Sequence, residues 1–363
     1  MSNIVNNYLK IIRKVFPVNA KSSVVGLDIG PSSCKAVELV CRNGGYELLR
    51  WMVEPVVGTD DKALSAALGK ILSAFGLQAK ARPLITSVSG KGTLIRYVDM
   101  PKMSQMDLRR AFAIESDKYF PFPRDTVYTD CHILSTFDGN RKMSVLVAAV
   151  KKDLVESRMK VLKEAGLDSS TVTLNPVAVA NAFATFPPDG FLGGAEAQSF
   201  KACAVVDIGE TGTNLMIIFA GSPRFNRDIF IGAQEIYKRA ANLLGVPQDE
   251  VRGLLAYGKP VNETLQKGVS AVMADLISEI RLSFDYFITE KNLAVTQIFL
   301  TGDGACIAGV EPAFRQGIDI PVAVWDPFEK MAAASPAVKE GLKPHGSSLI
   351  GALGMALNEY DQG

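Results

Sequence analysis

Short apolar runs separated by polar turns begin the chain and recur near its middle. The apolar runs 24–28, 36–40 and 46–53 predict a meander of three strands. The runs 202–206 and 215–219 restart the same pattern. In both places the first run leads into the triplet Asp-Ile-Gly and then into small hydroxyl residues. This repeat, about half a chain apart, predicts two related half-domains.

Longer segments between and after the meanders have helical periodicity or further strand character. Helices are predicted at 60–75, 104–119, 151–165, 175–186, 236–244, 247–255, 275–290 and 347–358. Further strands are predicted at 83–88, 93–98, 128–134, 143–150, 297–300 and 322–324. Because strands alternate with helices in both halves, the predicted fold class is α/β.

Residues 101–142 differ in texture from the strands on either side. A helix capped by Ser104 stops at the Pro-Phe-Pro sequence 121–123, and a strand and a turn follow it. This stretch reads as an insert, and the Pro- and Gly-rich stretch 187–201 reads as a linker. The other predicted units are 22–100 plus 143–186 as the first subdomain, 202–235 plus 295–363 as the second, and 236–294 as a helical subdomain.

Residues 1–21 form an amphipathic segment in which Ile4, Tyr8, Ile11 and Val15 recur at helical spacing. Its interpretations stay open: a helix at a membrane surface, a helix that docks a partner, a frayed tail, or a helix packed on its own domain. The start has no signal-peptide pattern. No run approaches the roughly 20 apolar residues of a membrane span.

Composition narrows the classes of function without choosing one. The 363 residues are 48% hydrophobic and 21% charged, as in a soluble globular protein with several subdomains. A formal net charge of +1 predicts no general attraction to nucleic acid. The five cysteines lack CxxC spacing, which favours reduced thiols in a cytosolic protein. His132 and His345 show no metal-binding pattern and are predicted to be structural or surface residues.

The first turn has residue types that suit a phosphate group. Gly30 lets the backbone approach a ligand closely, and the backbone with Ser32 and Ser33 can hold phosphate oxygens. Lys35 adds a cation, and Asp28 at the strand end can hold Mg²⁺ through water. A plain polar hairpin explains the same residues, so the turn alone decides nothing.

The second turn offers similar chemistry in the same order. Asp207 again stands at the strand end, as a second carboxylate for Mg²⁺ through water, and Gly209, Thr211, Gly212 and Thr213 follow it. The coincidence of the two turns, rather than either one, favours a phosphate chain between two halves.

A third turn follows the buried strand 297–300. Gly302, Asp303 and Gly304 make a Gly-x-Gly sequence that permits a flat ring or a ribose to lie on the backbone. The chain has no GxxxxGK[ST] sequence and no GxGxxG after a strand, so two other common nucleotide folds lose support.

The three turns, in this order and spacing, resemble the phosphate-1, phosphate-2 and adenosine motifs of the actin/Hsp70/sugar-kinase superfamily. Within it the chain resembles the PilM family of type IV pilus assembly, over about residues 22–358. The resemblance rests on the segments VGLDIGPSSCKAVEL, MPKMSQMDLRRAFAIESDKYFPFPRDTVYTDCHIL, VVDIGETGTNLMII and IFLTGDGACIAGVEPAFRQGIDIPVAVWDPF. The second of these, in the insert, favours this family over sugar kinases and chaperones.

The resemblance implies an actin-like ATPase fold, with two duplicated RNase-H-like halves around a nucleotide cleft and a small α+β insert in the first half. It implies ATP and Mg²⁺ as cofactors, held by the residues of the three turns, and it places Glu279 against the ribose or adenine. Pro31, Asn175 and Asp303 depart from the family pattern. These departures favour slow ATP hydrolysis or none.

The resemblance also implies a cytoplasmic assembly protein, peripheral to the inner membrane, of a pilus or a related secretion machine. Its partner would be the cytoplasmic N-terminal tail of an inner-membrane PilN-like protein, in a groove near Arg109, Tyr119 and Phe122. For the two aromatics the alternative is core packing. Self-association into rings or filaments, a nucleotide-free scaffold, an FtsA-like cell-division protein and a metabolite kinase are further alternatives.

Overall fold

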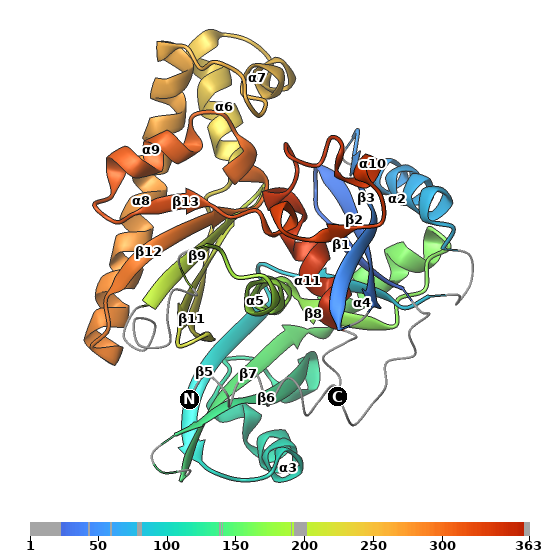
Figure 1. Ribbon diagram of the computed structural model, residues 1–363. Helices are drawn as coiled ribbons and strands as arrows, with labels where there is room; N and C mark the ends of the chain where they lie inside the picture. The colour runs from blue at the N-terminus through green and yellow to red at the C-terminus, as the bar shows by residue number, and fades with distance from the viewer. Residues whose placement is uncertain are drawn as a thin grey trace.

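The computed structural model describes residues 23–42, 44–58, 60–77, 82–137, 139, 141–189, 191 and 202–358. These residues form three sheets with helices between and around them (Figure 1). The first sheet has the strand order β14-β3-β2-β1-β4-β8. Its strands are β1 (Val24–Ile29), β2 (Ser33–Arg42), β3 (Gly45–Pro55), β4 (Leu84–Val88), β8 (Thr171–Leu174) and β14 (Ala332–Ala333).

The second sheet, of order β11-β10-β9-β12-β13, repeats the arrangement of the first. Its strands are β9 (Ala202–Ile208), β10 (Thr213–Phe219), β11 (Ser222–Ile229), β12 (Val295–Thr301) and β13 (Val322–Val324). In each sheet three antiparallel strands form a meander, and two more strands continue in parallel beside the first. The predicted duplication is therefore a duplication of a five-strand topology, to which β14 adds an edge strand in the first sheet.

Two helices, α5 (Asn175–Thr185) and α11 (Ile350–Asn358), share one apolar core with residues of both sheets (Figure 1). A Cβ on Gly26 of β1 would collide with the carbonyl oxygen of Ala352, and one on Gly354 with that of Ala178. Glycine at these two positions lets α11 pack backbone to backbone against β1 and α5. The close approach sets the spacing of the layers between the two sheets.

The remaining helices cover the outer faces of the two sheets. On the first sheet these are α2 (Asp61–Phe75) and α4 (Lys152–Glu164). On the second they are α8 (Glu263–Lys291) and α9 (Val310–Gly317), while α6 (Ala233–Leu244) packs on α8, and α7 (Gln248–Leu254) packs on α6 (Figure 1). Side-chain caps begin two of them, α2 and α8: Asp60 accepts from the N–H of Ala63 at 2.9 Å at the start of α2.

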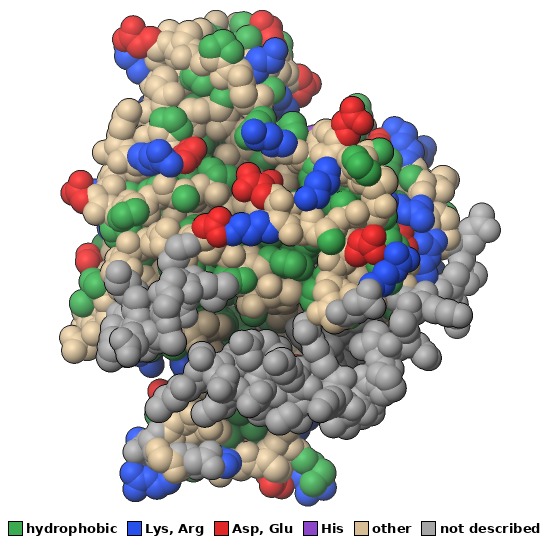
Figure 2. Space-filling model, in the orientation of Figure 1, with side chains coloured by type: hydrophobic (Ala, Val, Ile, Leu, Met, Phe, Trp, Pro, Cys, Tyr) green, Lys and Arg blue, Asp and Glu red, His purple; other side chains and the backbone are tan. Residues whose placement is uncertain are grey.

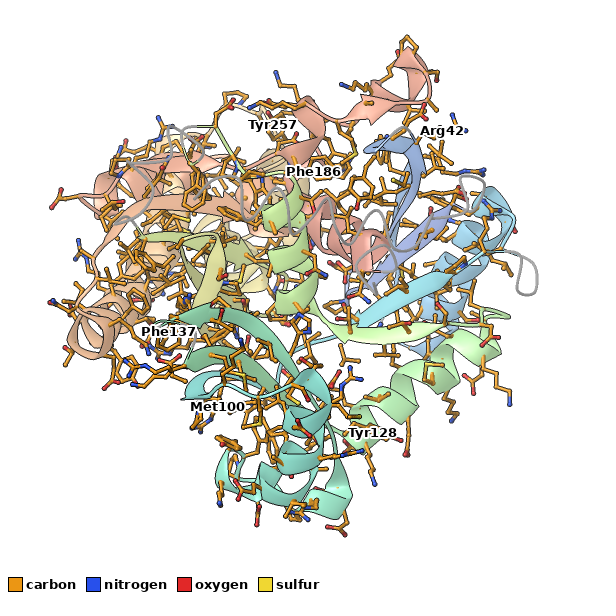
Figure 3. All side chains as sticks on the ribbon, turned by 60° about the horizontal axis from the view of Figure 1, so that its bottom comes forward. Arg42, Met100, Tyr128, Phe137, Phe186 and Tyr257 are labelled. Carbon is orange, nitrogen blue, oxygen red and sulfur yellow. The ribbon has the colours of Figure 1, made fainter. Side chains whose placement is uncertain are left out.

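The third sheet, of order β5-β7-β6, belongs to the insert. Its strands are β5 (Thr93–Pro101), β6 (Val127–Phe137) and β7 (Lys142–Lys151), and α3 (Gln105–Glu115) packs on β6. Figure 3 brings this part forward and labels Met100, Tyr128 and Phe137 in it. Because β5 and β7 pair along their whole lengths, the sheet extends beyond the predicted range 101–142 on both sides.

The insert also contacts the second half. Arg224 of β11 donates through Nη2 to the Oγ of Ser135 in β6 at 3.3 Å. The Nζ of Lys291 in α8 lies 3.9 Å from Oδ2 of Asp99 in β5. The insert therefore touches both halves and not only the one whose sequence it interrupts.

The predicted helices and strands are found, with different bounds in places. The largest difference is α8, which begins at Glu263 rather than 275 and is capped by Asn262. Gly268 interrupts the apolar stripe in the first turns of α8. The helical periodicity of the sequence therefore did not predict this part of the helix. The structure explains that glycine, because a Cβ there would lie 3.2 Å from the Cα of Ala240 in α6.

Other predictions concern the chain as a whole. Residues 1–21 and most of 187–201 lie outside the described residues. Among the described helices, none is long and apolar enough to cross a membrane. The five cysteines are unpaired, and Cys34, Cys131 and Cys203 are buried. Acidic and basic side chains are interspersed on the face in Figure 2, in keeping with the net charge of +1.

Candidate functional site

Both Asp-Ile-Gly turns are closed by the same backbone hydrogen bond. The Gly30 N–H donates to the Ser33 carbonyl at 3.0 Å, and the Gly209 N–H donates to the Gly212 carbonyl at 2.9 Å. A Cβ on Gly30 would lie 3.1 Å from its acceptor oxygen, and one on Gly209 would lie 3.0 Å from its own. The same crowding therefore favours glycine in both copies.

The two strand-end aspartates differ in their cross-strand partners. Asp28 lies opposite Lys35, whereas Asp207 lies opposite Asn214. Asn214 does not turn to the aspartate, because its Nδ2 donates to Oδ1 of Asp228 on β11 at 2.7 Å. The first turn thus carries a cation at the position where the second carries an amide.

The third turn packs directly on the second. β12 runs parallel to β9, with Thr301 opposite Asp207, and ends in the predicted Gly-x-Gly. A Cβ on Gly302 would collide with the Asp207 carboxylate, and one on Gly304 would collide with the Ile208 side chain. Gly302 also has φ +83°, a conformation that favours glycine. The structure therefore brings the predicted second and third motifs together.

Lys35 connects the first turn with the third. Its Nζ donates to Oδ2 of Asp303 at 2.7 Å and lies 3.6 Å from Oδ2 of Asp28. The side chain is only 5% exposed, so the ammonium depends on these carboxylates for its solvation. Although burial alone lowers it, the charges of Asp303 and then Asp28 hold the pKa of Lys35 above its ordinary value. The lysine is a fixed cation that joins the two halves.

Asp207 shows the opposite electrostatic effect. Burial, and next the charge of Asp28, raise the pKa of Asp207 from 3.8 to about 6. Asn175, at the start of α5, donates through Nδ2 to Oδ2 of Asp207 at 2.9 Å. The Oδ1 of Asn175 is buried without a hydrogen-bond partner among the described residues. A Cβ on Gly351 would lie 2.7 Å from that oxygen and 3.8 Å from Oδ2 of Asp28.

These groups fit the cofactors that the sequence predicts. Lys35 supplies the buried cation that a phosphate needs. Asp28, Asp207 and the unpartnered oxygen of Asn175 are acceptors of the kind that bind the waters of a hydrated Mg²⁺. No group of three or more acidic, His or Cys side chains suited to direct metal ligation occurs in the described chain. The arrangement thus suits a metal held through water.

The predicted hydroxyl residues are not equivalent. Ser32 and Ser33 are half-buried at the first turn, and Thr211 is exposed at the second. Thr213 is buried, and its Oγ1 donates to the carbonyl of Ile231 at 2.6 Å. The hydroxyl of Thr213 therefore already has a partner within the protein. The hydroxyls of Ser32, Ser33 and Thr211 remain for a ligand.

Two arginines that the sequence did not single out brace the turns from outside. Arg158 of α4 donates through Nη1 to the carbonyl of Ile29 at 3.1 Å. Arg252 of α7 pairs with Glu210 in the second turn and lies 4.2 Å from the centroid of the Tyr237 ring. Both arginines lie in polar stretches of amphipathic helices, so no local pattern marks them.

Glu279 lies on α8, as predicted, and forms an ion pair with Arg227 of β11. Its Oε2 accepts from Nη2 of Arg227 on β11 at 2.7 Å, and both side chains are 39% exposed. The same arginine donates to Oγ of Ser283 at 2.9 Å. Glu279 thus has a partner within the second half, and its contact with a ribose or adenine stays a prediction.

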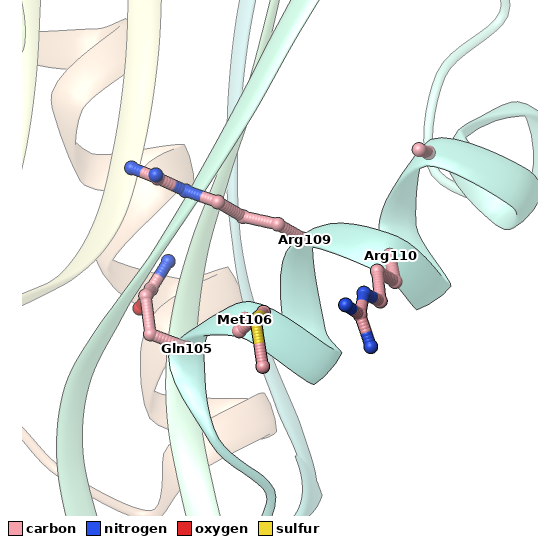
Figure 4. Close-up of a pocket in the computed structure, with 5 residues that line it drawn as sticks. Gln105, Met106, Arg109 and Arg110 are labelled. Carbon is pink, nitrogen blue, oxygen red and sulfur yellow. The ribbon is translucent and has the colours of Figure 1, made fainter.

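The predicted partner-binding residues divide into two kinds. Tyr119 and Phe122 pack in the core of the insert, where the Tyr119 ring lies 5.8 Å from that of Phe112. Arg109 is 64% exposed on α3. It borders a shallow hollow of about 530 Å³ along that helix (Figure 4), which is lined by Gln105, Met106, Arg109, Arg110 and Ala113. Helix α3 therefore forms an exposed face of the insert, and the two aromatics pack beneath it.

Comparison with solved structures identifies the fold. The chain is similar to a chain of the "PilM-PilN type IV pilus biogenesis complex", with a TM-score of 0.74 and 21% identity over 93% of this chain and 98% of that one. It is also similar to the ethanolamine utilization protein EutJ from Carboxydothermus hydrogenoformans, with a TM-score of 0.54 and 15% identity over 97% and 96% of the two chains. The fold is the predicted actin-like one.

The sequence matches a known family over nearly its whole length. The family described as "Type IV pilus assembly protein PilM" matches residues 26–360. This range includes all three turns and the insert. The chain therefore belongs to the PilM family of type IV pilus assembly proteins.

Proposed function

We propose that this protein is a cytoplasmic, ATP-binding assembly component of a type IV pilus or related secretion machine. It binds Mg-ATP in the cleft between its halves and the cytoplasmic tail of an inner-membrane PilN-like protein on its insert. Membership of the PilM family supports the biological setting. The observation that carries the nucleotide site is the buried Lys35, which lies between the carboxylates of the first and third glycine-containing turns.

In this proposal different residues of the cleft bind different parts of Mg-ATP. Lys35 and the two turns at Gly30 and Gly209 hold the phosphates, and Asp28 and Asp207 orient the waters of Mg²⁺. The backbone at Gly302 and Gly304 faces the nucleoside. The bound metal neutralises phosphate charge that the carboxylates would otherwise repel.

Calorimetry with Mg-ATP tests the nucleotide site. We expect saturable binding to the wild type and at least tenfold weaker binding to Lys35→Met, since a buried charge-assisted contact is lost. Lys267→Met, which removes an exposed cation on α8, is the matched control. Equal binding by the Lys35 and Lys267 variants would show that the nucleotide lies elsewhere.

The proposed partner site lies on the insert. The similar solved chain comes from a complex with PilN. In this chain the insert presents the exposed α3 face with two adjacent arginines, Arg109 and Arg110, beside the shallow hollow. We infer that the PilN-like tail binds next to this face and that Tyr119 and Phe122 keep the helix in place.

Charge reversal tests the partner site more cleanly than deletion. Removing 101–142 would cut out α3 and β6 and leave β5 and β7 as a pair of strands without the third strand and the helix that cover them. The double variant Arg109→Glu/Arg110→Glu keeps the core and is expected to weaken co-purification with the tail at least tenfold. The control is Lys238→Glu/Arg239→Glu, an adjacent exposed pair on α6. Equal loss in both variants would argue against the insert as the docking face.

A further inference from the structure

Lys35, the cation proposed to bind phosphate, already has an anionic partner in this structure. Its Nζ donates to Oδ2 of Asp303 at 2.7 Å, closer than the 3.6 Å that separates it from Asp28. Asp303 stands in the third turn, on the other half of the molecule. We propose that Asp303 is an internal competitor of the nucleotide phosphates for Lys35. The inference rests on the proposed nucleotide site and adds a residue that sets its affinity.

The other cations beside the turns are committed elsewhere. Arg158 donates to the carbonyl of Ile29 and its charge acts on Asp28, and Arg252 pairs with Glu210. An incoming phosphate therefore meets a site whose one buried ammonium is already paired and whose carboxylates repel it. Binding requires that the phosphate take the place of the Asp303 carboxylate on Lys35. The apparent affinity is then the intrinsic affinity multiplied by the fraction of molecules in which the pair is open.

The backbone around Asp303 holds its carboxylate in this position. Gly302 adopts its left-handed φ against Asp207, and Gly304 packs on Ile208, so the turn is fixed on both sides of the aspartate. The side chain itself is 27% exposed and fills no apolar core. A change confined to this side chain is therefore expected to leave the fold of the turn intact.

Nucleotide affinity of the Asp303→Asn variant tests the proposal. We expect calorimetry to show Mg-ATP and Mg-ADP binding about tenfold tighter than to the wild type, because the competing charge is gone while the side-chain size is kept. Asp303→Ser, with a smaller side chain, is expected to act in the same direction. Asp319→Asn removes the same charge from an exposed loop of the same half and is expected to change nothing. Unchanged or weaker binding by both Asp303 variants would overturn the proposal.

Chemical labelling of Lys35 separates this proposal from the nucleotide site itself. If neither wild type nor variants bind nucleotide, the proposed nucleotide site fails, and amine labelling of Lys35 followed by mass spectrometry decides whether Asp303 holds the lysine. We then expect several-fold faster labelling of Lys35 in Asp303→Asn than in wild type or Asp319→Asn. Equal labelling in all three proteins would show that Asp303 does not occupy Lys35, and the proposal would be wrong.

Discussion

The two Asp-Ile-Gly turns have one backbone and two electrostatic characters. Each turn is closed by a glycine N–H that donates to the carbonyl three residues ahead. In the first copy the strand-end Asp28 faces Lys35, and in the second Asp207 faces Asn214. The two copies thus keep the same turn geometry. The charged side chains differ between them, because only the first copy has a lysine opposite its aspartate.

The difference shows that the second turn depends on the first for its charge balance. The charge of Lys35 lowers the pKa of Asp207, but burial and the charge of Asp28 outweigh it. Asp303, which extends from the second half, takes the shortest contact with the lysine. Lys35 therefore pairs with carboxylates from both halves. Matched substitutions in the two copies are expected to have different effects.

The largest effect is expected where the copies differ in packing. Gly26 precedes Asp28 by two residues in the first copy. The buried Val205 precedes Asp207 by two residues in the second. Gly26→Ala places a Cβ against the Ala352 carbonyl in α11, where only backbone movement relieves the collision. We expect a loss of more than about 4 kcal/mol in the free energy of unfolding, beyond the usual range for overpacking.

Val205→Ala is the matched change in the second copy. It is expected to cost about 2 kcal/mol, the low end for removing buried apolar groups. Urea denaturation followed by circular dichroism measures both variants. A smaller loss for Gly26→Ala than for Val205→Ala would mean that α11 moves away easily, contrary to the packing described above.

The next effect concerns the cation itself. Lys35→Met removes the partner of Asp303 and Asp28 and leaves two partly exposed carboxylates without their cation, which is expected to cost about 3 kcal/mol at pH 8. Asn214→Ala in the second copy loses one hydrogen bond to Asp228 and is expected to cost about 1 kcal/mol. Urea denaturation at pH 8 compares the two. Equal costs would show that the lysine does not balance the carboxylates.

A smaller effect depends on pH. The folded protein binds a proton at Asp207 with a pKa of about 6, against 3.8 for an ordinary Asp, so this group's contribution to stability is full below about pH 4 and is lost as the pH rises through 6. Asp207→Asn removes this dependence. At pH 8 we expect it to be more stable than wild type by about 2 kcal/mol, with no gain at pH 4. Thermal melts from pH 4 to 8 measure the difference.

Asp28→Asn is the counterpart in the first copy and is expected to act in the opposite direction. Asp28 lies 3.6 Å from the Nζ of Lys35, so its neutralisation removes a favourable charge pair at pH 8. If both Asn variants stabilise the protein at pH 8, simple repulsion between the carboxylates dominates and the lysine does not distinguish the copies.

Local patterns predicted the parts of the site, and only tertiary structure shows how they meet. Each turn is readable because apolar strand, glycine and small hydroxyl residues are neighbours in sequence. The Lys35–Asp303 pair joins residues far apart in the chain, and no local pattern contains it. β11 was missed for a related reason: as an edge strand, half-buried along most of its length, it carries Pro223 and several charged residues. The third sheet extends past the predicted range 101–142 because β5 and β7 have ordinary strand sequences, and only the fold shows that they pair with each other.

The smallest effect is expected where the two copies are alike. Gly30→Ala brings a Cβ within 3.1 Å of the Ser33 carbonyl oxygen, and Gly209→Ala brings one within 3.0 Å of the Gly212 oxygen. Neither glycine has a positive φ, so the cost is this contact alone, and a shift of a few tenths of an ångström relieves it. We expect each variant to lose about 1 kcal/mol in urea denaturation, within error of the other. Gly69→Ala, in open space on α2, is the control and is expected to be neutral or slightly stabilising. A clear difference between the two turn variants would mean that the shared hydrogen bond does not make the turns equivalent, and that the charge difference extends to the backbone.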